Sequence, residues 1–244
     1  MITIVLGMHR SGTSVVAGIL HFNKVTMGTY ETFWPRPLPQ NPKGFYENYD
    51  FRKINDTILR ESGYNTKHYK TRIPILEFSK NSKAKMIKTI EKYESKFENW
   101  GWKDPRTCLT ISNWMVVFQE MDLIEKVKII FVSRRSLSVA RSLKKRNDLP
   151  LLQGVNLWKV YTERAINFCE SNNIPTIYLS FEGILKKPVS ECEKIFKFLS
   201  QSFDKNVVND FVDENISTNS SGESFDIPEN IVILEKKIEK LILG

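Results

Sequence analysis

The sequence predicts an α/β protein with a three-layer fold, in which a central parallel sheet is flanked by helices on both faces. Short apolar runs rich in β-branched residues alternate along the chain with longer segments that have the apolar spacing of helices. The runs are mostly apolar, which is typical of strands buried on both faces. Strands that alternate with helices in this way form a parallel sheet wrapped on both sides.

Taken in order, the elements account for most of the chain. Strands are predicted at 2–6, 100–102, 127–132 and 175–179. Helices are predicted at 15–22, 48–62, 79–98, 108–119, in the basic segment that ends at 146, and at 152–172. Helices then complete the chain, and the amphipathic one at 231–243 packs either on its own domain or on a partner.

We expect residues 1–244 to form one domain with two mobile loops beside its ligands. The first loop, 28–50, opens with a stretch of Pro, Gly and aromatic residues that cannot form a regular helix. Phe33 and Trp34 in this loop are candidate contacts for a substrate. The second loop, 215–224, has the polar composition of a flexible segment.

The composition narrows the class of protein. Lys and Arg outnumber Asp and Glu by 36 to 28, a net charge of +8, which indicates either a solvated basic surface or attraction of a polyanionic ligand. The aromatic residues do not alternate with cations as nucleic-acid stacking platforms do, so no nucleic-acid partner is expected. Three scattered cysteines favour a reducing compartment and provide no metal site. Since no apolar run is long enough for a transmembrane segment, we expect a cytoplasmic protein.

The loop after the first strand has the features of an anion site. Its sequence is Gly7-Met8-His9-Arg10-Ser11-Gly12-Thr13-Ser14, and a predicted helix follows. Backbone N–H groups, the helix dipole and two hydroxyls can together hold a phosphate. The glycines have Walker A spacing, but Thr13 stands where that loop needs Lys, and the strand 128–132 ends without the carboxylate that binds magnesium in a kinase. The alternative is a glycine turn without a ligand.

This loop resembles the 5′-phosphosulfate loop of the sulfotransferase superfamily, whose donor is 3′-phosphoadenosine 5′-phosphosulfate (PAPS). The resemblance is to the bacterial and Golgi-type branches, where Arg replaces the Lys of cytosolic members. It implies that Arg10 contacts the donor and stabilises charge on the leaving group. It also implies that the 5′-phosphate is held by Ser11, Gly12, Thr13 and Ser14.

A second segment resembles the other signature of the same superfamily, an Arg at a strand end followed eight residues later by a Ser. Arg134 and Ser142 have this spacing, and the resemblance implies that both contact the 3′-phosphate. A guanidinium is a forked donor suited to phosphate oxygens. Arg135-Ser136 and Ser138 replace the Asn-Pro and Asp that the superfamily often has. Standing alone, the segment would be interpreted as a basic helix with solvated charges.

Three shorter segments also resemble members of the superfamily. Lys103 and Arg106 in 103–106 are candidates to face the sulfate and the acceptor, or else are surface charges of a Pro-stiffened turn. Glu47 is the candidate general base, or a carboxylate that stabilises a helix N-terminus. Phe181 stands at the place of a Tyr that stacks on adenine, or is a core aromatic.

The function implied by the resemblance is sulfuryl transfer from PAPS to a hydroxyl or amine acceptor, with carbohydrates favoured and no metal required. Two alternatives remain open, a small-molecule kinase with a P-loop and a non-catalytic module that binds a nucleotide or a polyanion. The superfamily often closes the donor site with a basic C-terminal loop. The segment 215–224 contains no Arg or Lys, so closure over the 3′-phosphate must use other residues or be absent.

Overall fold

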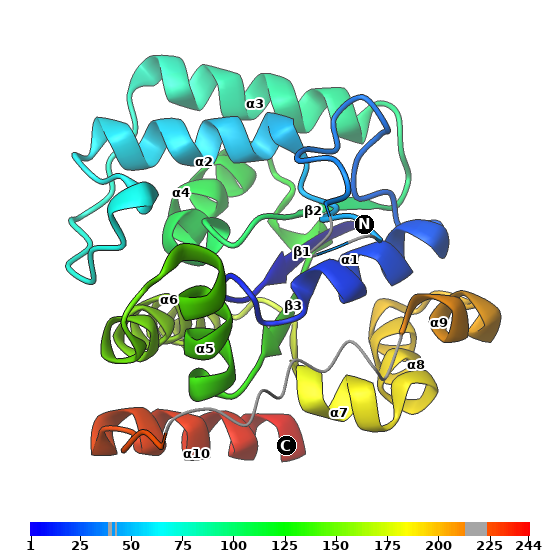
Figure 1. Cartoon of the computed structure of the whole chain (residues 1–244). Coiled ribbons are helices and arrows are strands. Elements are labelled where there is room, and N and C mark those ends of the chain that lie inside the picture. The colour runs from blue at the N-terminus through cyan, green and yellow to red at the C-terminus, as the bar shows by residue number, and fades with distance from the viewer. Residues whose placement is uncertain (39–40, 42, 213–223) are drawn as a thin grey trace.

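The centre of the molecule is a parallel four-stranded sheet (Figure 1). The computed structural model describes residues 1–38, 41, 43–212 and 224–244. The strands are β1 (Ile2–Leu6), β2 (Trp100–Lys103), β3 (Val127–Ser133) and β4 (Thr176–Ser180), in the order β2-β1-β3-β4. Ile2 of β1 is aligned with Trp100 on one side and with Val127 on the other. The predicted fold class, a parallel sheet between layers of helices, is confirmed.

Helices cover both faces of the sheet and its β2 side. One face carries α1 (Thr13–Phe22), α7 (Phe181–Lys186), α8 (Pro188–Leu199) and α9 (Lys205–Phe211). The other carries α4 (Thr107–Glu120), α5 (Ser136–Asn147), α6 (Leu151–Ser171) and α10 (Glu229–Leu243). Beyond β2 lie α2 (Tyr49–Glu61) and α3 (Lys80–Glu94), and two short 3₁₀ turns occur at η1 (Thr66–His68) and η2 (Ile124–Lys126).

The two faces have separate cores because side chains alternate along a strand. Ile2, Ile4 and Leu6 pack with α4, α5 and α6, whereas Val5 packs with α1 and α8. All five residues of β1 are buried. A strand covered on both faces needs apolar residues at both parities, which explains why these runs showed no alternation.

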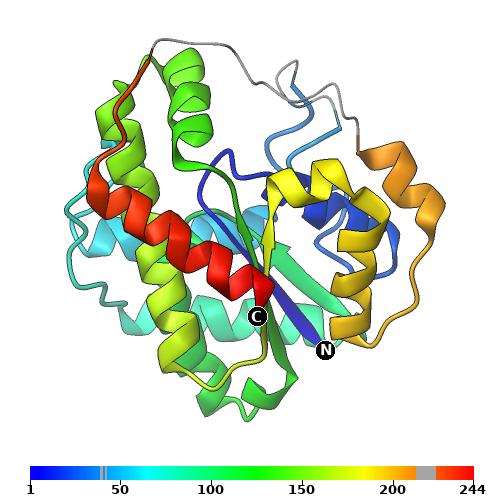
Figure 2. The ribbon, with the colours of Figure 1, turned by 90° about the horizontal axis from the view of Figure 1, so that it is seen from below.

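One predicted helix is too long, and one open question about the C-terminus is resolved. The helix predicted at 79–98 ends at Glu94, because the chain turns through 95–97 and enters the sheet, where the Trp100 N–H donates to the Met1 carbonyl. The tail at 231–243 packs on its own domain, where α10 lies against α6 and β4 (Figure 2).

No described helix combines the length and the apolar character needed to cross a membrane. The predicted loop at 215–224 falls outside the described residues up to 223.

Candidate active site at the carboxyl ends of the strands

The loop between β1 and α1 bends sharply so that the N-terminus of α1 faces the carboxyl edge of the sheet. Gly12 precedes α1 in a left-handed conformation, with φ of 84°, and the Ser11 N–H donates to the Met8 carbonyl at 3.2 Å. The Ser11 hydroxyl is buried and makes no hydrogen bond within the described residues. A buried hydroxyl beside a helix N-terminus provides a donor for an anion at this place.

Gly12 is also the point where the loop meets α7. A β-carbon at this position would lie 2.0 Å from the Phe181 ring, far inside van der Waals contact. Phe181 is buried, and the Arg134 guanidinium lies over its ring at 5.1 Å. The structure therefore places Phe181 between the loop and Arg134, and its stacking on adenine stays a prediction.

Replacing Gly12 by Ala is expected to destabilise the fold by more than the roughly 1–2 kcal/mol that a left-handed conformation costs a residue with a β-carbon. The additional loss comes from the displacement of Phe181. Gly63→Ala is the matched control, because Gly63 has a φ of 75° but no atom within 4 Å of its would-be β-carbon. Urea unfolding of both variants measures the difference, and equal losses would show that the Phe181 contact is unimportant.

Arg10 contacts both Ser142 and Arg134, although 124 residues separate the two arginines. The Arg10 Nε donates to the Ser142 hydroxyl at 2.8 Å, and an Arg134 N–H donates to the Arg10 carbonyl at 3.1 Å. Burial, and then the charges of Arg146 and Arg134, lower the pKa of Arg10 to about 10. An anion bound beside Arg10 would stabilise its charge against both effects.

The first turn of α5 is capped by carboxylates from other elements. The Arg135 N–H donates to Glu182 at 3.1 Å, and the Ser136 N–H donates to Glu235 of α10 at 2.7 Å. These two N–H groups are therefore already satisfied. The Ser142 hydroxyl lies farther along the same helix, where it contacts Arg10.

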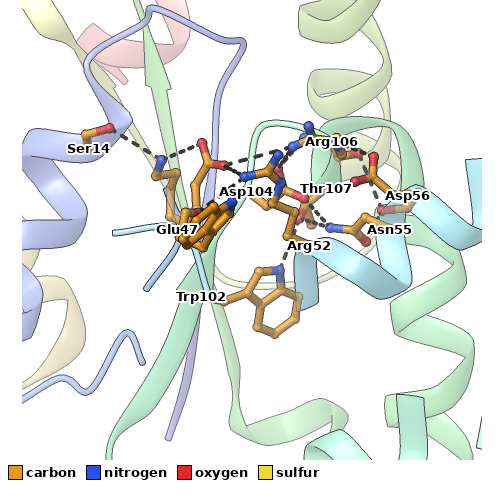
Figure 3. Close-up of polar contacts among 12 residues, drawn as sticks. Ser14, Glu47, Arg52, Asn55, Asp56, Trp102, Asp104, Arg106 and Thr107 are labelled. Carbon is orange, nitrogen blue, oxygen red and sulfur yellow. Dashed lines mark hydrogen bonds and ion pairs between the residues drawn. The ribbon is translucent and has the colours of Figure 1, made fainter. Parts of the chain in front are cut away.

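On the opposite side of the loop, Lys103 joins the start of α1 to the loop that precedes α2. Its ammonium lies 3.2 Å from a carboxylate oxygen of Glu47 and 3.4 Å from the Ser14 hydroxyl (Figure 3). Residue 47 is fixed there because its backbone pairs in parallel with residue 103, the last residue of β2. Burial lowers the pKa of Lys103, and the Glu47 charge acts in the opposite direction. The structure thus brings together two of the predicted catalytic residues.

Arg106 belongs to a buried network that the sequence analysis did not predict. Its guanidinium donates to Asp104 at 2.8 Å and to Asp56 at 2.7 Å, and lies 4.0 Å from Glu47 (Figure 3). Asn55 donates to the other Asp104 oxygen at 2.8 Å. Burial alone would raise the pKa of Asp104, but Arg106 and these hydrogen bonds hold it below its usual value. Because its guanidinium already serves these carboxylates, the proposed contact between Arg106 and the acceptor stays a prediction.

The two aromatic residues assigned to the acceptor point to different places. Phe33 pairs across an antiparallel bridge with Asn48, and its ring packs on His21 and Tyr46 at 5.0 and 5.2 Å. Directly paired residues share a face, so the next pair, Trp34 and Glu47, lies on the other face. Trp34 is 51% exposed. It remains a candidate acceptor platform beside the predicted base. Phe33 is half-buried and lines a separate pocket of the loop, and its contact with an acceptor stays a prediction.

Sequence reasoning also missed His9 as a neighbour of the site. Its ring meets the edge of Tyr161 at 5.8 Å. Burial, and then the Arg106 charge, lower the pKa of His9 well below its ordinary value, so the imidazole is neutral at pH 7. Its position within the loop identified it as a loop residue, but no spacing rule relates it to Tyr161 or Arg106.

Comparisons with known proteins identify the fold and no closer relationship. No protein-family model matches the sequence, and neither does any curated protein at a significant level. Solved structures do resemble it. The sulfotransferase domain of the Synechococcus PCC 7002 olefin synthase is 14% identical with a TM-score of 0.61, and the match covers 98% of this chain and 94% of that one.

Two other solved structures give the same result. The sulfotransferase domain from the curacin biosynthetic pathway is 14% identical with a TM-score of 0.56, over 97% of this chain and 96% of that one. Sulfotransferase STF9 from Mycobacterium avium is 15% identical with a TM-score of 0.53, over 99% of this chain and 74% of that one. The chain therefore has the fold of sulfotransferase domains.

Proposed function

We propose that this protein is a sulfotransferase that moves the sulfuryl group of PAPS to a hydroxyl or amine acceptor, with carbohydrates as the preferred class. The observation that carries the proposal is the pair of cations on opposite sides of the phosphate-type loop. Arg10 lies on Ser142 at one side, and Lys103 lies between Ser14 and Glu47 at the other. A donor with two separate anionic groups, a 3′-phosphate and a 5′-phosphosulfate, matches this arrangement.

The donor is held by residues from both motifs. Ser11 and the N-terminus of α1 receive the 5′-phosphate, for which the buried Ser11 hydroxyl is suited. Arg10, Arg134 and Ser142 receive the 3′-phosphate, whose charge offsets the burial and the neighbouring positive charges that lower the pKa of Arg10. In this proposal Arg10 takes a role on the 3′-phosphate side instead of the leaving-group role that the resemblance implied, and Lys103 faces the sulfuryl group; the contact of Arg10 with Ser142 supports this assignment.

The reaction is an in-line displacement at sulfur. Glu47 removes the proton of the acceptor as its oxygen or nitrogen forms a bond to sulfur, and the bond from sulfur to the 5′-phosphate oxygen breaks with its electron pair on that oxygen. The Lys103 ammonium, near the start of α1, stabilises the charge that develops on the sulfuryl and leaving oxygens. The rest of the rate enhancement comes from holding donor and acceptor in line.

Calorimetric titration with 3′-phosphoadenosine 5′-phosphate (PAP), the product of the donor, tests this assignment. We expect micromolar binding of PAP and much weaker binding of adenosine 5′-monophosphate and ATP. Arg134→Ala should weaken PAP binding by about 10- to 100-fold, the scale of a lost hydrogen bond to a charged group. Arg135→Ala is the matched control, since Arg135 is the exposed neighbour of Arg134. Equal affinity for PAP and adenosine 5′-monophosphate would refute the donor assignment.

The kinase alternative has less support from the structure. Thr13 occupies the position of the Walker lysine. β3 ends without the carboxylate that would bind magnesium, but β2 is followed by one, Asp104. That carboxylate accepts hydrogen bonds from Arg106 and Asn55 and is fully buried. Magnesium-dependent binding of ATP in the same titration would favour the kinase instead.

A further inference from the structure

Several segments of this chain carry Lys and Arg without any carboxylate. Residues 63–76 and 133–147 are two of them, and together they hold nine Lys and Arg residues: Lys67, Lys70, Arg72, Arg134, Arg135, Arg141, Lys144, Lys145 and Arg146. Residues 78–90, mostly on α3, hold four more lysines. Such local clusters of positive charge can each attract an anionic group, so the first two segments need an explanation of their own.

The proposed donor accounts for only one of the two segments. Residues 133–147 form the end of β3 and α5, which carry Arg134 and Ser142. Residues 63–76 follow α2 and provide none of the proposed donor contacts. Lys67, Lys70 and Arg72 are all exposed, and they make no ion pair within the part of the chain that the structure describes.

The unexplained segment forms one wall of a groove. The opposite wall is the start of α6, which follows directly on α5, and the Gln153 amide donates to the Tyr69 carbonyl at 3.1 Å across the base. The groove has a volume of about 550 Å³. Besides cations, its lining offers hydrogen-bonding side chains from Thr71, Gln153 and Asn156. Tyr69 is half-buried, and no exposed Phe, Tyr or Trp lines the described groove.

The groove is anchored close to the reaction centre but extends beyond it. The Tyr64 hydroxyl donates to the Lys70 carbonyl at 2.7 Å and also interacts with Tyr161, whose ring meets His9 of the loop. The groove also lies beyond the end of α2. This helix carries Asp56, which belongs to the site, and it ends five residues later at Glu61, about 8 Å further along the helix axis. Because the groove lies past the end of α2, we expect a ligand that contacts both Glu47 and Lys70 to be an extended one.

We infer that the groove between residues 66–72 and the start of α6 binds an extended anionic polysaccharide, and that such a chain is the acceptor. This inference rests on the proposed function. Cations hold the carboxylate or sulfate groups of the chain, while hydroxyl and amide side chains hydrogen-bond to its hydroxyls. A single-stranded nucleic acid would need exposed aromatic platforms for its bases, and the described groove has no exposed Phe, Tyr or Trp.

The test compares two triple variants that lose the same charge. The first is Lys67→Ala, Lys70→Ala, Arg72→Ala, and the control is Lys197→Ala, Lys236→Ala, Lys240→Ala, which removes three exposed lysines from α8 and α10. Binding of fluorescent heparin oligosaccharides, of polygalacturonate, of neutral dextran and of single-stranded DNA is measured at low and at physiological salt. PAP affinity is measured for every variant.

We expect heparin or polygalacturonate to bind the full-length protein better than dextran and DNA, with an affinity that falls as salt rises. The groove variant should bind the polysaccharide at least about tenfold more weakly than the control, as three partly screened contacts imply, with unchanged PAP affinity. Equal weakening in both triple variants, a preference for DNA, or equal binding of dextran would overturn the inference. If the unaltered protein does not bind PAP, the sulfotransferase proposal itself is refuted. Failure of the proposed function can therefore be distinguished from failure of the groove assignment.

Discussion

Replacing Glu47 by Gln is expected to lower the rate constant of sulfuryl transfer by about 10²- to 10⁴-fold, the contribution of a positioned general base. Gln has nearly the shape of Glu but cannot accept the proton of the acceptor. Glu47 is the carboxylate 3.2 Å from Lys103 and is mostly buried beside the start of α1. The measurement is the rate of PAP release from PAPS, with an acceptor that the unaltered protein sulfates.

Two controls separate catalysis from folding in the Glu47→Gln variant. Asp50→Asn makes the same change, from a carboxylate to an amide, three residues further along the chain. The Asp50 carboxylate pairs with Lys92, away from the proposed acceptor, so this variant should retain full activity. PAP affinity should change little in both variants, because Glu47 lies on the acceptor side of the loop. A Glu47→Gln variant that transfers sulfate at the unaltered rate would exclude Glu47 as the base.

Replacing Asp104 by Ala is expected to lower the free energy of unfolding by about 3–5 kcal/mol, the typical cost of removing one partner from a buried ion pair. Asp104 is fully buried and accepts hydrogen bonds from Arg106 and Asn55. Without it, the Arg106 guanidinium keeps Asp56 but loses its nearest buried carboxylate. Urea unfolding at pH 7 measures the change.

The control for Asp104→Ala is Glu120→Ala, which removes the exposed pair with Lys83 and should cost at most about 1 kcal/mol. The pH dependence gives a second test. Because folding lowers the pKa of Asp104, its contribution is present above the unfolded pKa of about 4 and is lost as pH falls through the folded pKa. The difference between the unaltered protein and the variant should therefore shrink in acid. A loss no larger than that of the control would show that the network is dispensable.

Much of the fold could be predicted because its strands are short, buried and separated by helices. The run at 2–6 is apolar at positions of both parities, and only a strand with helices on both faces requires this. The end of the helix predicted at 79–98 was wrong, because residues 95–98 have helical composition but are drawn into the connection to β2. The helix propensity of these residues does not include the hydrogen bonds that the following residues form with the sheet.

The candidate site was predictable to a smaller extent. The loop at 7–14 and the pair Arg134 and Ser142 were found because each has a spacing along one strand–turn–helix unit. Lys103 and Glu47 were each chosen from short segments, but their contact depends on a backbone pairing between residues 56 positions apart. Arg106 was assigned to the acceptor, and the structure pairs it with Asp104 and Asp56, two carboxylates that no sequence pattern groups with it.

The sequence by itself determined the succession of strands and helices along the chain, the position of the phosphate-type loop and the presence of basic segments without carboxylates. These properties depend on neighbouring residues, whose periodicity and charge can be read along the chain. Tertiary structure alone decided which cation serves which side of the loop, which carboxylates are neutralised, and that residues 66–72 face α6 across a groove. These features depend on side chains that approach from distant elements, and the parallel sheet is what brings the carboxyl ends of those elements to one edge.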